Sequence, residues 1–231
     1  MIKAVFFDLY HTLIHYDPPQ EELVAKALKD FGINMDAEVF RLPIVAADDF
    51  IYAEIANRPL RHRSQEERVA LYTQYQGIVL REAGIEADEK LTLGLLGKMQ
   101  QFKMNLALFD DVAPALTDLK GRGLTLGLIS NIEQDINDTL TRLDLTSWLE
   151  IIVTSQDAGA NKPHPEIFQE ALRQAGVQPP EAIYVGDQYQ FDILGANGVG
   201  MKGILIDRIG YHEDITDCPK IHSFSEIVEY L

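Results

Sequence analysis

Six polar side chains stand at or shortly beyond the ends of apolar runs, and their types suit a single chemistry. They are Asp8, Ser130, Asn131, Lys162, Asp187 and Asp192. A carboxylate such as Asp8 can act as a nucleophile on phosphorus or carbon, which splits one difficult displacement into two easier ones through a covalent intermediate. Two further carboxylates would supply the hard oxygen ligands that Mg²⁺ prefers beside a phosphate substrate.

The other polar residues of this set complement the acids. Lys162 would balance their crowded negative charge, and the Ser130 hydroxyl would hold a phosphate oxygen together with nearby backbone N–H groups. Asn131 is expected to bind substrate beside Ser130. The set therefore predicts a site for an anionic small molecule, with Mg²⁺ as the cofactor.

Five apolar runs would position these residues. They are residues 2–7, 124–130, 150–155, 182–186 and 203–207. Each has the form of a strand buried on both faces. Helical segments lie between the runs, such as residues 111–123 and 164–176, with Pro near the start and Gly at the end of each. This alternation predicts a parallel sheet in an α/β domain, whose reactive loops gather at the carboxyl ends of the strands.

The alternation is absent between residue 17 and about residue 104, where three helical patterns follow one another. We therefore expect an all-helical insertion at residues 17–104, directly after the first strand. The core would comprise residues 1–16 and 105–231. Arg41 and the basic stretch RPLRHR at residues 58–63 lie in the insertion, and neither is assigned to the site.

Four motifs in this order resemble those of the haloacid dehalogenase (HAD) superfamily of hydrolases. The first reads DLYHT from Asp8, the second LGLISN, the third NKPHPEIF and the fourth YVGDQYQFD. The match covers about residues 1–15 and 105–231. It implies a Rossmann-like parallel-sheet core with a helical cap domain inserted after the first motif.

The resemblance also implies roles for individual residues. Asp8 would attack phosphorus to form an aspartyl-phosphate, which water then cleaves. Mg²⁺ would be held by Asp8, Asp187 and the Tyr10 backbone carbonyl, while Asp192 would support the metal's ligands or Lys162. The chain is thus expected to be a Mg²⁺-dependent phosphatase for a small phosphorylated metabolite.

Tyr10 departs from the phosphatase pattern, in which a second Asp at this position protonates the leaving group and later activates water. A phenol has a reference pKa of about 10, so Tyr10 could act as a catalytic proton donor but is a poor base at pH 7. Tyr at this position resembles the 2-haloacid dehalogenases, which use no metal and whose halide leaving group needs no proton. We keep that activity as an alternative, although the acidic pair Asp187 and Asp192 favours the phosphatase. A second alternative is a weakly active or non-catalytic ligand-binding protein of the same fold.

Composition narrows the other possibilities. The 231 residues include 46% hydrophobic and 24% charged residues, which suits a globular chain. The formal net charge of −16 opposes binding to nucleic acid. A single cysteine and the lack of a signal-peptide pattern or of an apolar run of about 18 residues predict a cytoplasmic protein without a membrane segment. The sequence does not predict the oligomeric state.

Overall fold

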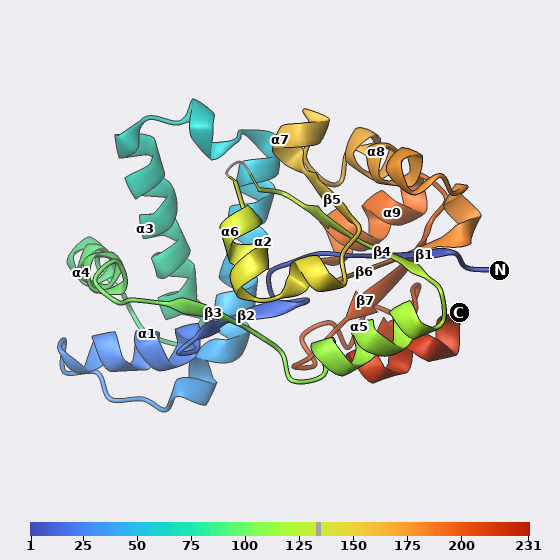
Figure 1. The fold of residues 1–231 in the computed structure, drawn as a ribbon. Coiled ribbons are helices and arrows are strands. Elements are labelled where there is room, and N and C mark those ends of the chain that lie inside the picture. The colour runs from blue at the N-terminus through green and yellow to red at the C-terminus, as the bar shows by residue number, and fades with distance from the viewer. Residues whose placement is uncertain (133–134) are drawn as a thin grey trace. The chain divides into compact units, whose positions relative to one another are not determined.

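The computed structural model describes residues 1–132 and 135–231. This described part of the chain divides into two compact units. The first contains Met1–His15 and Leu106–Leu231, and the second contains Tyr16–Asn105. Figure 1 shows the elements of both units along the chain.

A parallel sheet forms the centre of the first unit. Among the described residues it has six strands in the order β5-β4-β1-β6-β7-β8. These strands are β1 (Ala4–Phe7), β4 (Thr125–Ser130), β5 (Ile151–Thr154), β6 (Ala182–Gly186), β7 (Lys202–Ile206) and β8 (Lys220–Ile221). Phe7 lies opposite Leu128 of β4 and Val185 of β6. The carboxyl ends of these three central strands therefore meet at one edge of the sheet.

The five predicted apolar runs are confirmed as strands of this sheet, with bounds that shift by one or two residues. The run at 182–186 matches β6, whereas the run at 2–7 begins two residues before β1. Strand β8 was not predicted, because its two residues are too few to show an apolar pattern. The predicted α/β class with a Rossmann-like parallel sheet is correct.

Helices cover the sheet of the first unit. They are α5 (Val112–Gly121), α6 (Asn137–Arg142), α7 (Ser155–Ala158), α8 (Pro165–Ala175) and α9 (Leu194–Gly198), with 3₁₀-helices at Leu145–Ser147, Pro179–Glu181 and Phe224–Tyr230 and a π-helical turn at Tyr189–Ile193. Pro165 begins α8, and Gly176 follows its last residue with a φ of 65°. Glycine adopts this left-handed conformation without steric strain.

The side chains of β1 show that both faces of the sheet are covered. Val5 and Phe7 belong to an apolar cluster with residues of α5 and of the C-terminal 3₁₀-helix. Ala4 and Phe6 belong to a second cluster with residues of α8 and α9, which lie on the other side of the sheet from α5 (Figure 1). Alternate residues of a strand point to opposite faces, so a strand covered on both sides is apolar throughout. This burial explains why Ala4–Phe7 is apolar at every position, whereas the exposed Lys3 precedes the strand.

The second unit is helical. Its helices are α1 (Gln20–Lys29), α2 (Arg41–Asn57), α3 (Gln65–Glu82) and α4 (Glu89–Met99), with 3₁₀-helices at Ala37–Phe40 and Leu60–His62. They enclose an apolar cluster of their own, centred on side chains such as Leu28, Phe40 and Leu80. Ser64 caps α3 through a reciprocal pair of hydrogen bonds with Glu67.

Two short strands not predicted from the sequence lie where the chain passes between the units. They are β2 (Ile14–Asp17) and β3 (Asn105–Leu108), which form a two-stranded sheet. Their four residues each are too few to stand out beside the neighbouring helical patterns. In the described part of the chain, no helix is both long enough and apolar enough to span a bilayer.

Candidate active site

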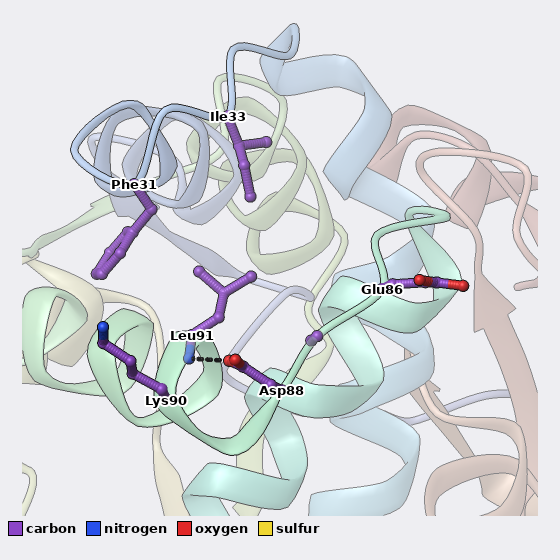
Figure 2. Close-up of a pocket in the computed structure, with 7 residues that line it drawn as sticks. Phe31, Ile33, Glu86, Asp88, Lys90 and Leu91 are labelled. Carbon is purple, nitrogen blue, oxygen red and sulfur yellow. Dashed lines mark hydrogen bonds between the residues drawn. The ribbon is translucent and has the colours of Figure 1, made fainter.

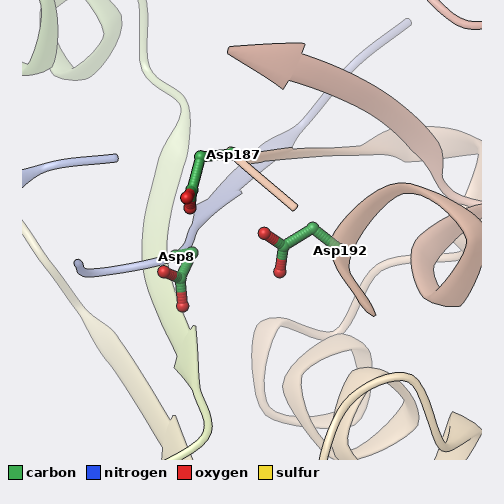
Figure 3. Close-up of side chains that lie close together, drawn as sticks. All are labelled: Asp8, Asp187 and Asp192. Carbon is green, nitrogen blue, oxygen red and sulfur yellow. The ribbon is translucent and has the colours of Figure 1, made fainter. Parts of the chain in front are cut away.

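Three acidic side chains meet at the carboxyl edge of the sheet in the first unit. Asp8 follows β1, Asp187 follows β6, and Asp192 lies in the π-helical turn at Tyr189–Ile193. Each offers one carboxylate oxygen, and these oxygens lie within 4.8 Å of one another. In Figure 3 the side chains of Asp187 and Asp192 extend toward Asp8. Such a group of hard oxygen ligands suits Mg²⁺.

Lys162 lies among these acids and is almost fully buried. Its Nζ donates hydrogen bonds to Asp8 Oδ1 and Asp192 Oδ1, each at 2.6 Å, and to the Tyr184 hydroxyl at 2.9 Å. Burial alone would lower the pKa of Lys162, but the carboxylates of Asp192 and Asp8 outweigh it and raise that pKa. The lysine therefore remains a cation beside the candidate nucleophile.

Ser130 and Asn131 also reach this site, from the end of β4. Ser130 Oγ donates to Asp8 Oδ1 at 3.1 Å. The Asn131 side chain makes a pair of hydrogen bonds with the main chain of Lys162, accepting from its N–H at 2.6 Å and donating to its carbonyl at 3.1 Å. Asn131 thus fixes the segment that carries the lysine, and its contact with substrate stays a prediction.

Asp192 is fully buried, and hydrogen bonds occupy both of its carboxylate oxygens. Oδ1 accepts from Lys162 and from the Tyr184 hydroxyl at 3.0 Å, and Oδ2 accepts from the Gln188 N–H at 3.0 Å. Burial raises the pKa of Asp192, Lys162 opposes that rise, and Asp8 adds to it. These contacts favour a role for Asp192 in holding the lysine rather than in binding a metal directly.

Asp187 keeps part of its surface accessible, and its Oδ1 accepts from the Thr12 hydroxyl at 3.1 Å. Burial of its carboxylate, together with repulsion from Asp192 and Asp8, raises its pKa well above the usual range. No hydrogen bond to Asp187 Oδ2 or Asp8 Oδ2 is found within the residues that the structure describes. Two carboxylate oxygens and an unbalanced negative charge thus fit a divalent cation.

Tyr10 lies two residues beyond Asp8 and is half-buried. Burial, and to a lesser extent the carboxylate of Asp8, raises the pKa of its phenol above the usual value. The phenol therefore stays protonated at neutral pH. Its role as a catalytic group and that of its carbonyl as a metal ligand stay predictions.

Three residues that support the site were not predicted as site residues. Thr12 binds Asp187, and Tyr184 joins Lys162 to Asp192 through its hydroxyl. At Gly186, a Cβ atom would lie 2.2 Å from Asp192 Oδ2, so only glycine leaves room for that carboxylate. Tyr184 carries the one side-chain hydroxyl in the AIYVG run, and this polar group in a buried strand could have marked it as a site residue.

Arg41 and the basic stretch lie in the second unit and pair with acids there. Arg41 Nε lies 3.1 Å from Glu21 Oε1, and Arg58 NH1 lies 2.7 Å from Glu67 Oε1. The second unit also contains an open pocket of about 590 Å³, which is lined by residues of that unit (Figure 2). Inside it, the Leu91 N–H donates to Asp88 Oδ1 at 2.8 Å, the cap of α4. This pocket contains none of the acids that carry the predicted chemistry.

Comparison with known proteins identifies the family. The model of the haloacid dehalogenase-like hydrolases matches residues 51–206. The chain belongs to the haloacid dehalogenase-like hydrolase family. The predicted resemblance to HAD hydrolases is thereby confirmed, and the protein is a hydrolase of this family.

Two named relatives are similar to this chain over most of its length. A protein of Methanopyrus kandleri named glyceraldehyde 3-phosphate phosphatase is 31% identical over 218 residues, which are 92% of this chain and 87% of the relative. The haloacid dehalogenase-like hydrolase domain-containing protein 3 of Mus musculus is 43% identical over 211 residues, which are 89% of this chain and 82% of the relative.

Among solved HAD structures, one of a 2-haloacid dehalogenase from Pseudomonas syringae is similar with a TM-score of 0.57. It is 30% identical to this chain, and the similarity covers 99% of this chain and 97% of the dehalogenase. This HAD hydrolase is therefore similar both to a protein named as a phosphatase and to one named as a dehalogenase.

Proposed function

We propose that this HAD hydrolase is a Mg²⁺-dependent phosphatase that acts on a small phosphorylated metabolite. The observation that carries the proposal is the convergence of Asp8, Asp187 and Asp192, whose oxygens lie within 4.8 Å of one another. Three carboxylates around a single lysine leave a negative charge that a divalent cation would balance. Dehalogenation without a metal would not explain why Asp187 and Asp192 lie together beside Asp8.

The residues present fit Mg²⁺. Asp8 and Asp187 would hold it, with the Tyr10 backbone carbonyl as a further ligand. Asp192 would act from outside the direct ligands, since Lys162, Tyr184 and Gln188 already occupy its oxygens. When bound, Mg²⁺ would polarise the phosphoryl group and offset its negative charge.

Asp8 would attack phosphorus and form an aspartyl-phosphate as the alcohol leaves. Lys162 would hold the Asp8 carboxylate in place before attack and neutralise charge on the phosphoryl oxygens during it. Ser130 and Asn131 would bind a phosphoryl oxygen beside it. Water then attacks phosphorus, releases phosphate and restores the Asp8 carboxylate.

Tyr10 would limit the range of substrates. A phenol whose pKa lies above its usual value is a weaker proton donor to the leaving group than a carboxylic acid, and it cannot activate water as a carboxylate does. The proposed phosphatase would therefore turn over esters of acidic alcohols faster than alkyl phosphates.

We also propose that the helical unit Tyr16–Asn105 is the cap that selects the substrate. It is inserted in the chain between the first and second motifs. The name of the Methanopyrus kandleri relative supports a small phosphorylated metabolite as the substrate. The net charge of −16 opposes a nucleic-acid partner, and a cytoplasmic location stays a prediction.

Two observations favour 2-haloacid dehalogenation as the second candidate. Tyr10 stands at the position where the dehalogenases carry a tyrosine, and a solved dehalogenase is 30% identical to this chain. In that reaction Asp8 would displace the halide at carbon, and water would then cleave the ester at the Asp8 carbonyl carbon. Turnover in ¹⁸O-labelled water would put the label into Asp8 in this case, and into phosphate in the phosphatase.

The direct test measures phosphate release from p-nitrophenyl phosphate with Mg²⁺ and with a chelator. The leaving group needs little protonation, so the missing second Asp does not mask a working nucleophile. We expect Mg²⁺-dependent release by the wild type, none by Asp8→Asn, and unchanged release by Asp118→Asn, an exposed acid on α5. Equal release by Asp8→Asn and wild type would exclude the proposed nucleophile. Chloride release from 2-chloropropionate without phosphate release would establish the dehalogenase instead.

A further inference from the structure

Asp187 is held on two sides by residues to which the proposed chemistry assigns no role. The fully buried Thr12 donates from its hydroxyl to Asp187 Oδ1 at 3.1 Å. On the main-chain side, His212 Nε2 lies 3.2 Å from the Asp187 carbonyl oxygen. A carbonyl only accepts, so His212 donates from Nε2. The Thr12 contact orients the Asp187 carboxylate, and the His212 contact fixes the main chain that carries it.

Arg208, two residues beyond the end of β7, fixes Thr12. Its NH2 group donates to the Thr12 carbonyl at 3.0 Å, and its NH1 group donates to Asp111 Oδ2 at 3.0 Å. The guanidinium also stacks over the Phe109 ring, 3.9 Å from the ring centroid. Asp111 is itself bound by the Ser223 hydroxyl at 2.9 Å. The arginine thus joins Asp111 and Phe109 to the turn that carries Thr12.

Asp207 fixes the loop that carries His212. Its side chain is buried, and its carboxylate accepts the N–H groups of Tyr211 at 2.9 Å and of His212 at 3.0 Å. Lys220 Nζ also donates to the His212 carbonyl. Burying a carboxylate is costly unless hydrogen bonds compensate it. The proposed reaction does not use Asp207, so a role in shaping this loop explains why a carboxylate is buried there.

We propose that Asp207, Arg208 and His212 are positioning residues for Asp187, through one contact to its main chain and one chain of contacts to its carboxylate. The inference rests on the proposed role of Asp187 as a Mg²⁺ ligand. Mg²⁺ demands nearly ideal octahedral geometry, so a ligand that is fixed before the ion arrives binds it more tightly. The segment after β7 would then determine the Mg²⁺ affinity of the enzyme although it supplies no ligand.

The test is a Mg²⁺ titration of the full chain, read as the increase of the melting temperature and, separately, as hydrolysis of p-nitrophenyl phosphate. We expect His212→Ala and Arg208→Lys to raise the half-saturating Mg²⁺ concentration in both assays by about 10- to 100-fold, the usual effect of losing a residue that orients a ligand. Their kcat at saturating Mg²⁺ should stay near that of the wild type. His212→Gln should restore much of the affinity, because its amide can also donate to the Asp187 carbonyl.

Glu213→Gln is the matched control, since Glu213 is the exposed neighbour of His212. It should titrate like the wild type. If His212→Ala and Arg208→Lys bind Mg²⁺ as the wild type does, the positioning role is wrong while the proposed function stands. If the wild type itself shows neither a Mg²⁺-induced rise of the melting temperature nor Mg²⁺-dependent hydrolysis, the proposed metal site fails, and this inference fails with it.

Discussion

Lys162 Nζ lies 2.6 Å from both Asp8 Oδ1 and Asp192 Oδ1, so that one buried cation joins the candidate nucleophile to a second acid. All three side chains are almost entirely buried. In such a place a charge is tolerated only with close, hydrogen-bonded partners. Asp192 therefore supports the position of the nucleophile indirectly, through the lysine that the two acids share.

The first prediction concerns Asp192. Asp192→Ala leaves Lys162 with one acidic partner in a buried site, and removing one member of a buried ion pair typically costs about 3–5 kcal/mol. We expect a loss near the lower end of that range, because Asp8 remains. Urea unfolding measures it, with Asp214→Ala, an exposed acid, as the control. A free energy of unfolding equal to that of the wild type would contradict the dependence of Lys162 on Asp192.

A second prediction concerns the glycine beneath Asp192. In Gly186→Ala the new Cβ would lie 2.2 Å from Asp192 Oδ2 and would displace that carboxylate from Lys162. We expect a loss of about 1–3 kcal/mol from overpacking, together with a large fall in kcat. Gly121→Ala is the matched control, since nothing lies within 4 Å of its added Cβ. Normal activity in Gly186→Ala would show that Asp192 can move without effect on the nucleophile.

Tyr184→Phe tests the shared hydroxyl. The hydroxyl contacts Lys162 Nζ at 2.9 Å, Asp192 Oδ1 at 3.0 Å and the Ile129 carbonyl at 3.1 Å. Loss of a hydrogen bond to charged groups costs about 1.5–3 kcal/mol, so we expect a decrease of that size in the free energy of unfolding. Tyr230→Phe is the control: it removes a hydroxyl but keeps the ring over which the Lys202 ammonium lies, and it should leave the free energy of unfolding unchanged. Equal stability of the two variants would remove Tyr184 from the support of the site.

The fourth prediction addresses the leaving group. Tyr10→Asp would supply the acid and base that the phosphatase pattern has at this position. General acid–base groups typically contribute about 10²- to 10⁴-fold, so kcat/KM should rise more for glycerol phosphate, an alkyl ester, than for p-nitrophenyl phosphate. The ratio of the two kcat/KM values is the measurement, because it cancels losses common to both substrates. An unchanged ratio would mean that proton transfer at residue 10 does not limit the reaction.

Much of the fold was predictable because burial on both faces leaves a clear mark in the sequence. The strand residues before Asp8 (Ala4–Phe7) and before Asp187 (Ala182–Gly186) are all buried, and their mainly apolar character marked the strands and placed both acids at one edge. Strand β8 is too short to leave such a mark. The two strands at Ile14–Asp17 and Asn105–Leu108 were missed because the adjacent helical patterns are much longer.

The supporting contacts of the site were harder to predict. Thr12 and Tyr184 act through hydroxyl groups whose partners lie 175 and 22 residues away along the chain. Residue 186 must be glycine because the side chain of Asp192 extends from the π-helical turn into the space that a Cβ atom would take. Such relationships arise from packing in three dimensions and leave no periodic pattern in the sequence.

The covalent intermediate on Asp8 is the most direct test of the proposed function. The enzyme is quenched in acid during turnover of a phosphate ester with Mg²⁺, reduced with borohydride, and digested for mass spectrometry of the peptide that contains residue 8. An aspartyl-phosphate is reduced to homoserine, whereas a free carboxylate is not, so we predict homoserine at residue 8 only in samples that contain substrate. Phosphate release at an undiminished rate in a sample whose Asp8 is never reduced would contradict the proposed mechanism.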